Sequence, residues 1–258
     1  MYKAAHEVWA AVSGTTPGEA WLRRDEPRAP EHLERYRDAI AQLKRGVPFA
    51  YAVGRVGFRT LDLAVDRRAL IPRPETEGLV ELVLARCSTG IVADIGTGCG
   101  CLALALAVEG QFDRVVAVEQ SAPAAALARE NVKRLAPRTP VEIREGNLLA
   151  PLVDKGKRYR AIVSNPPYLT AAEYDELDRS VSDFEPRDAL VSGVDGLEAT
   201  RSLFAGAAAL LEPDGLLAVE IDERRADAIH ALGREHGWDV EIHADLFGCP
   251  RYALAKEA

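Results

Sequence analysis

Apolar residues follow strand-like and helix-like spacings in turn from Ile91 to the end of the chain. Strands are predicted at Ile91–Ile95, Arg114–Glu119, Val141–Arg144, Arg160–Ser164, Leu216–Ile221, Asp239–His243 and Arg251–Ala255. Helices are predicted at Cys101–Glu109, Ala122–Leu135, Gly196–Leu211 and Glu223–His236. This alternation favours an α/β fold whose sheet is covered on both faces. We expect a mostly parallel seven-stranded sheet that a late antiparallel hairpin closes.

The chain before this region is patterned differently. Helical spacing over Tyr2–Val12 and Glu31–Arg45 predicts a small helical N-terminal domain at residues 1–48. A strand pair at Tyr51–Val56 and Thr60–Val65 is expected to form a β-hairpin connector within residues 49–70. Residues 71–258 then form the main domain.

Composition limits the function without assigning one. The chain has 258 residues, 48% of them hydrophobic, and a net charge of −8, with a first 48 residues close to neutral. Nucleic-acid affinity comes largely from Lys and Arg, so sequence-specific nucleic acid binding is not expected. The start of the chain does not resemble a secretory signal, and its longest apolar run is too short to span a membrane. A cytoplasmic protein is therefore expected.

The four cysteines match no zinc ribbon and no disulfide framework, so no metal is predicted. Cys99 and Cys101 are separated by a single residue beside a glycine-rich loop, where small-residue packing explains them better than metal binding. Reduced thiols agree with a cytosolic location.

A glycine-rich loop follows the first strand of the alternating region. Its loop residues are Asp94, Gly96, Thr97, Gly98, Cys99 and Gly100. Glycines there let the backbone approach a ligand, and Glu119 at the end of the next strand can accept both hydroxyls of a ribose. The combination predicts a nucleoside-cofactor site. A nicotinamide cofactor is a weaker alternative, because the third glycine falls one position early for the dinucleotide pattern.

A second motif, Asn165-Pro166-Pro167-Tyr168, ends the fourth strand of this region. Proline cannot donate to a sheet ladder, so the sequence forms a stiff corner at the carboxyl edge of the sheet. Asn165 and the neighbouring carbonyls supply acceptors, and Tyr168 supplies an aromatic wall. These groups suit an amide or an aromatic amine that bears two hydrogens, held for attack on a methyl group.

The two motifs together resemble class I methyltransferases that use S-adenosyl-L-methionine. Further segments narrow the resemblance to the PrmC/HemK family of protein-(glutamine-N5) methyltransferases. They are Gly46–Tyr51, Gly54–Phe58, Leu70–Glu77, Phe184–Leu190 and Asp245–Arg251. Members of that family modify the Gly-Gly-Gln glutamine of class I peptide chain release factors, so the resemblance implies a release factor as the protein partner.

The resemblance also implies roles for individual residues. The glycine-rich loop would cradle the methionine part of S-adenosylmethionine, Glu119 would hold its ribose, and Asn147 and Leu148 would border its adenine. Asn165 would lie between cofactor and substrate, with Pro166, Pro167 and Tyr168 completing a glutamine pocket. The helical N-terminal domain would help to hold the release factor.

The sequence departs from the family pattern at three positions. Asn147 stands where aspartate is usual, Leu148 where an aromatic residue is frequent, and Asp222 where glycine is usual. The helical N-terminal piece is also short for the family. Three alternatives therefore stay open: an amino-methyltransferase acting on a nucleic-acid base, one acting on another protein glutamine, and a non-catalytic module that retains the cofactor. The sequence also leaves open whether Arg73 and Glu77 brace the pocket or the connector.

Overall fold

The computed structural model describes residues 2–153 and 156–258, so position 1 and positions 154–155 of the predicted domains lie outside the described residues. Its main feature is a seven-stranded sheet with the order β5-β4-β3-β6-β7-β9-β8. The strands are β3 (Ile91–Ile95), β4 (Arg114–Glu119), β5 (Val141–Glu145), β6 (Tyr159–Ser164), β7 (Leu211–Glu220), β8 (Trp238–Ala244) and β9 (Pro250–Glu257).

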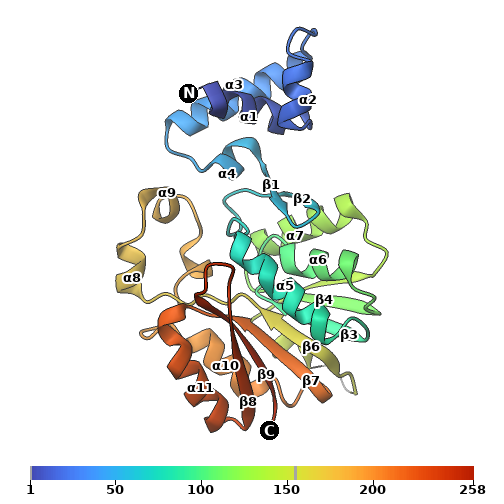
Figure 1. Cartoon of the computed structure of the whole chain (residues 1–258), viewed down its shortest axis with the longest axis vertical. Coiled ribbons are helices and arrows are strands. Elements are labelled where there is room, and N and C mark those ends of the chain that lie inside the picture. Colours follow the sequence, from blue (N-terminus) through green and yellow to red (C-terminus); the bar gives the residue numbers. More distant parts are fainter. Residues whose placement is uncertain (1, 154–155) are drawn as a thin grey trace.

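The pairing confirms the predicted topology. Strands β5, β4, β3, β6 and β7 run parallel, whereas β9 pairs antiparallel with both β7 and β8. The antiparallel hairpin therefore closes one edge of the sheet, with its second strand inserted between β7 and β8 (Figure 1). The carboxyl ends of β3, β4 and β6 meet at one edge, where open sheets of this kind bind ligands.

Helices cover both faces of the sheet. Helices α5 (Pro74–Arg86), α6 (Cys101–Glu109) and α7 (Ala122–Leu135) pack on one face, and α10 (Glu198–Gly206) and α11 (Ala226–Glu235) pack on the other. Neighbouring strand residues enter opposite cores, as a period of two requires: Val92 lies in the first core and Ala93 in the second. The short elements are α8 (Ala171–Asp175), α9 (Arg179–Ser182), η1 (Ala150–Leu152), η2 (Arg187–Ala189) and η3 (Glu223–Arg225).

The N-terminal segment has a separate hydrophobic core. Its helices are α1 (Tyr2–Ser13), α2 (Pro17–Leu22), α3 (Pro30–Lys44) and α4 (Phe49–Val53), and the hairpin strands β1 (Arg55–Phe58) and β2 (Leu61–Ala64) follow. Val8, Val12 and Ala39 are the most deeply buried apolar residues that α1 and α3 contribute to this core. In Figure 1 these first helices stand apart from the sheet, and α4 and the hairpin lie between them.

Four predicted elements differ from the structure. The strand expected at Leu216–Ile221 begins at Leu211, and the helix expected at Glu223–His236 is η3 followed by α11. The strand expected at Tyr51–Val56 is wrong in its first half: residues 49–53 form α4, which ends at Gly54 with a left-handed φ of 74°. Four consecutive residues of α4 are buried, so its pattern is an unbroken apolar run that does not distinguish helix from strand. The helix expected at Gly196–Leu211 is shorter in the structure: α10 spans Glu198–Gly206, and Leu211 already belongs to β7.

None of the helices in residues 2–153 and 156–258 is suited to crossing a membrane. Each is too short or too polar to span a bilayer.

Candidate active site

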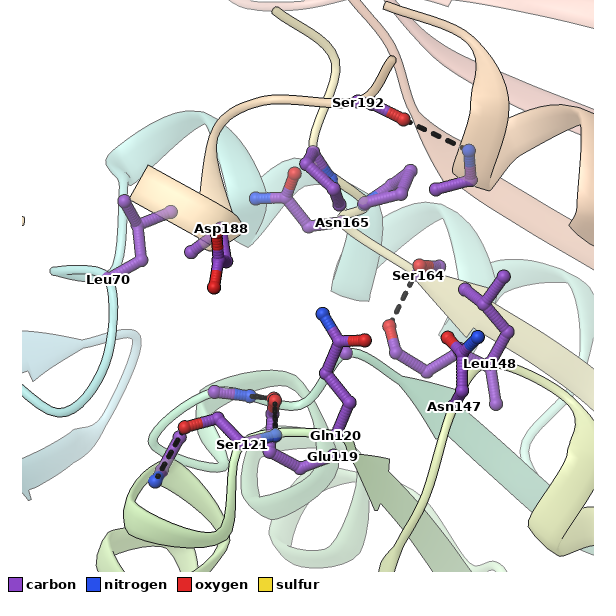
Figure 2. A pocket seen from close by; sticks show the side chains of 18 of the residues that line it. Leu70, Glu119, Gln120, Ser121, Asn147, Leu148, Ser164, Asn165, Asp188 and Ser192 are labelled. Carbon is purple, nitrogen blue, oxygen red and sulfur yellow. Dashed lines mark hydrogen bonds between the residues drawn. The ribbon is translucent and has the colours of Figure 1, made fainter. Parts of the chain in front are cut away.

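A cavity of about 700 Å³ opens at the carboxyl ends of β3, β4 and β6. The glycine-rich loop and the residues after β4 form one side, and the corner after β6 forms the other. Figure 2 shows Asn165 across the open space from Glu119 and Gln120. The two motifs that the sequence singled out therefore share one cavity.

The glycine-rich loop reaches the cavity through its first two glycines. Gly96 and Gly98 line the cavity and have left-handed φ values of 72° and 58°. A Cβ placed on Gly96 would meet no atom within 4 Å. The requirement for glycine is therefore conformational at this position, and it leaves the backbone open to a ligand.

The other loop residues lie behind the cavity and build the loop. Asp94 is fully buried, and its Oδ2 accepts hydrogen bonds from the Thr97 hydroxyl (2.6 Å) and the Ala103 amide (3.0 Å). Burial raises the pKa of Asp94 to about 7. The Cys99 carbonyl accepts from the Asn131 side chain at 2.9 Å. Gly100, with φ 90°, precedes the first residue of α6.

Glu119 connects the loop to the next strand. One carboxylate oxygen accepts from the Gly98 amide and the other from the Ser121 amide, each at 2.9 Å (Figure 2). Glu119 is 8% exposed and lines the cavity. Each carboxylate oxygen has a second lone pair, so the group can hold the loop and still accept a ligand hydroxyl.

Asn147 and Leu148 follow β5 and line the cavity on the same side as Glu119. Asn147 is exposed, and Leu148 is partly buried with a left-handed φ of 46°. Leu148 packs against the core on the α10–α11 face of the sheet. The structure thus brings both residues to the cavity.

The corner after β6 presents three of its four predicted residues to the cavity. Asn165, Pro166 and Pro167 line it. Tyr168 lies beside them around a separate void of about 10 Å³, with Leu70 among its neighbours. Burial raises the pKa of Tyr168 to about 12, so its hydroxyl stays protonated at neutral pH.

The Leu70–Glu77 segment braces both the cavity and the connector. Arg73 pairs at 2.6 Å with Glu185, whose second carboxylate oxygen accepts from the Ile71 amide at 3.0 Å. Glu185 precedes Pro186, which lines the cavity. Glu77 instead accepts from the Arg59 amide at 2.8 Å in the turn between β1 and β2. The sequence left this assignment open, and the structure gives the two residues different roles.

Several residues that line the cavity were not predicted as site residues. Some of them belong to the Leu70–Glu77 and Phe184–Leu190 segments that carry the family resemblance. Those segments alone do not indicate which side chains face the cavity. The additional lining residues include Arg68, Leu70, Gln120, Ser121, Ser164, Pro186, Asp188, Ser192 and Glu198.

Asp222, the departure after β7, has a local explanation. Its Oδ1 caps η3 by accepting from the Arg224 amide at 2.9 Å. It also pairs with the Arg224 and Arg225 guanidinium groups, which both reach Glu173 of α8. The carboxylate therefore anchors a short helix outside the cavity.

Comparison with known proteins agrees with this architecture. The family model of the methyltransferase small domain matches residues 75–180, and the PrmC N-terminal domain model matches residues 3–54. A solved methyltransferase from Pyrococcus furiosus superposes with a TM-score of 0.58 at 21% identity, covering 88% of this chain and 98% of that one. Fold and site together define a Rossmann-like methyltransferase of class I.

Sequence relatives identify the family. The release factor glutamine methyltransferase of Xylella fastidiosa is 42% identical over 225 residues, which cover 85% of this chain and 75% of the relative. That of Moorella thermoacetica is 41% identical over 238 residues, covering 90% and 83%. The chain belongs to the release factor glutamine methyltransferase family.

Proposed function

We propose that the protein transfers a methyl group from S-adenosylmethionine to the side-chain amide nitrogen of the Gly-Gly-Gln glutamine in a class I release factor. The observation that carries the proposal is the shared cavity. One side of the cavity, with the glycine-rich loop and Glu119, suits a nucleoside cofactor, and the opposite side, at Asn165, suits a substrate amide. The names of the relatives supply a release factor glutamine as the substrate, and the resemblance of the sequence motifs adds the Gly-Gly-Gln motif and the class I release factor.

The residues present fit S-adenosylmethionine. A cavity of about 700 Å³ lies within the usual range for small-molecule sites. Gly96 and Gly98 would hold the methionine part, Glu119 the ribose hydroxyls, and Asn147 and Leu148 the adenine. Asp94, Thr97, Cys99 and Gly100 would act through the shape of the loop. When bound, the cofactor supplies a methyl group on a positively charged sulfur, open to displacement by an aligned lone pair.

The corner after β6 supports a glutamine amide as the acceptor of the methyl group. An amide nitrogen is a weak nucleophile, because its lone pair is delocalised into the carbonyl. The Asn165 Oδ1 and the Pro166 carbonyl would accept its two hydrogens and orient the lone pair, a task of alignment more than of acid–base catalysis. Pro167 and Tyr168 would complete the glutamine pocket.

The helical N-terminal segment is proposed to recognise the release factor. The division into residues 1–48, the connector at 49–70 and the methyltransferase domain at 71–258 belongs to this proposal. Its support is the hydrophobic core that α1 and α3 share with α4 of the connector, and the match to the PrmC N-terminal domain model, which extends to residue 54. A net charge of −8 favours a protein partner over nucleic acid.

A labelled-methyl assay tests the proposal. The protein is incubated with methyl-labelled S-adenosylmethionine and, separately, a class I release factor, DNA and RNA, and the label is mapped by mass spectrometry. We expect label on the Gly-Gly-Gln glutamine alone. Label on a base, or on a different protein glutamine, would overturn the substrate assignment. Cofactor binding in calorimetry without transfer to any substrate would favour a non-catalytic module.

Replacing Asn147 with aspartate is expected to tighten cofactor binding. A carboxylate accepts the adenine amine from either oxygen, whereas the asparagine amide must be turned correctly to offer its single oxygen. A gain of about 1 kcal/mol, or roughly fivefold in Kd, is expected from a charge-assisted hydrogen bond. Calorimetry with S-adenosylmethionine measures it. Unchanged or weaker affinity in Asn147→Asp would mean that this residue does not face the adenine amine.

A further inference from the structure

Asn165 belongs to a buried hydrogen-bond chain that continues away from the cavity. Its Nδ2 donates to the Thr76 hydroxyl at 3.0 Å, and that hydroxyl donates to the Glu220 carboxylate at 2.7 Å. Thr76 and Glu220 are each 2% exposed. The chain joins the first turn of α5, the end of β7 and the corner after β6.

The donor-to-acceptor order of these hydrogen bonds determines which atom of the Asn165 amide remains free to bind a ligand. A threonine hydroxyl has one proton, and an ionised carboxylate can only accept. With the proton directed at Glu220, the Thr76 oxygen can offer Asn165 only a lone pair, which selects the Asn165 Nδ2. Within the described residues, Asn165 Oδ1 makes no hydrogen bond, so it is the atom of this cavity-lining amide that is left to accept one from a ligand.

We propose that Thr76 and Glu220 are positioning residues that hold the Asn165 amide with its oxygen, and not its nitrogen, toward the substrate amide. This inference rests on the proposed function. An amide turned by half a rotation would place its NH₂ group against the NH₂ group of the glutamine. Two donors would then face each other, and the glutamine nitrogen would lose the acceptor that aligns it.

The charged surroundings of Glu220 bear on its ionisation. Burial raises the pKa of Glu220 to about 7, while Arg251 and Arg73 favour the charged form and Glu75 opposes it. Tyr168 and Tyr252 lie close enough to interact with the Glu220 charge. Burial, together with this charge, raises the pKa of each tyrosine to about 12, so both hydroxyls stay neutral. The other facing group on α5 is the Thr76 hydroxyl.

Protonation of Glu220 would allow the donor and acceptor roles in these hydrogen bonds to reverse. A protonated carboxyl can donate to Thr76, whose hydroxyl can then donate to Asn165 Oδ1 and stabilise the turned amide. The productive form is the ionised one, so kcat should fall as the pH is lowered through about 7.

Substitution at Thr76 gives the direct test. At saturating cofactor and release factor, Thr76→Val is expected to lower kcat by about 10²-fold, with KM for the release factor and cofactor affinity in calorimetry changed less than about threefold. Thr76→Ser, which keeps the hydroxyl, should recover most of kcat. The matched control is Thr200→Val. Thr200 lies on α10 and is as deeply buried as Thr76, but it takes no part in the hydrogen bonds that join Asn165, Thr76 and Glu220. Melting temperatures are compared throughout.

The second arm uses Glu220→Gln and remains informative if Thr76→Val does not fold. The amide has no charge to titrate, so the acidic limb of the kcat profile should disappear. An acidic limb that persists unchanged would assign that titration to another group and contradict the proposal, as would Thr76→Val with wild-type kcat. A wild-type enzyme that methylates no glutamine would instead defeat the proposed function itself.

Discussion

Asn165→Ala is expected to lose methyl transfer almost completely while still binding S-adenosylmethionine. The substitution removes the Oδ1 acceptor from the cavity and leaves the Thr76 hydroxyl without the donor that it meets at 3.0 Å. Loss of one preorganised polar contact to a reacting group costs about 10²–10³ in kcat. The glycine-rich loop and Glu119 lie on the other side of the cavity, so the cofactor Kd should change less than about threefold (Figure 2).

Asn147→Ala is the matched control for this prediction. It removes the same side-chain amide from the same cavity, but at the end proposed for adenine. It should weaken cofactor binding and, at saturating cofactor, leave kcat within a few-fold of wild type. Single-turnover transfer to the release factor and calorimetry separate the two effects. Full turnover by Asn165→Ala would show that the asparagine does not orient the glutamine.

The strands of the sheet were predictable because burial on both faces leaves a clear signal. Strands β3 and β4 begin and end at the predicted residues, since Ile91–Ile95 and Arg114–Glu119 are short, mainly apolar segments between polar turns. Helix α4 was not predictable in the same way. Its buried residues form one short apolar run, and the packing against α3 and α1 that decides its conformation is tertiary.

The sequence predicted the motifs that form the site, but not which of their residues face the cavity. Sequence spacing led to the glycine-rich loop, Glu119 and the corner at Asn165, because parallel strands bring their carboxyl ends to one edge. It could not distinguish Gly96, which lines the cavity, from Asp94, which is buried behind it. The pairing of Thr76 with Asn165 joins residues 89 positions apart, and nothing in either motif encodes it.

Glu119→Ala is expected to produce the largest loss of cofactor affinity. The variant removes the acceptor proposed for both ribose hydroxyls, and hydrogen bonds to a charged group contribute about 1.5–3 kcal/mol each. It also frees the Gly98 and Ser121 amides that the carboxylate holds at 2.9 Å, so the glycine-rich loop loses its link to β4. Together these losses should raise the Kd for S-adenosylmethionine by at least about 10²-fold.

Glu145→Ala provides a control of the same chemistry one strand away. Glu145 is the register partner of Glu119 on β5, but it pairs with Arg129 at 2.7 Å and does not line the cavity. Its removal deletes a half-exposed surface ion pair, worth about 0–1 kcal/mol, and should leave cofactor affinity unchanged. Calorimetry on both variants, with melting temperatures measured alongside, separates ligand contact from general loosening of the sheet edge. If Glu119→Ala bound S-adenosylmethionine as tightly as Glu145→Ala does, the ribose would have to be held elsewhere, because no other carboxylate of the described residues is both mostly buried and part of the cavity lining.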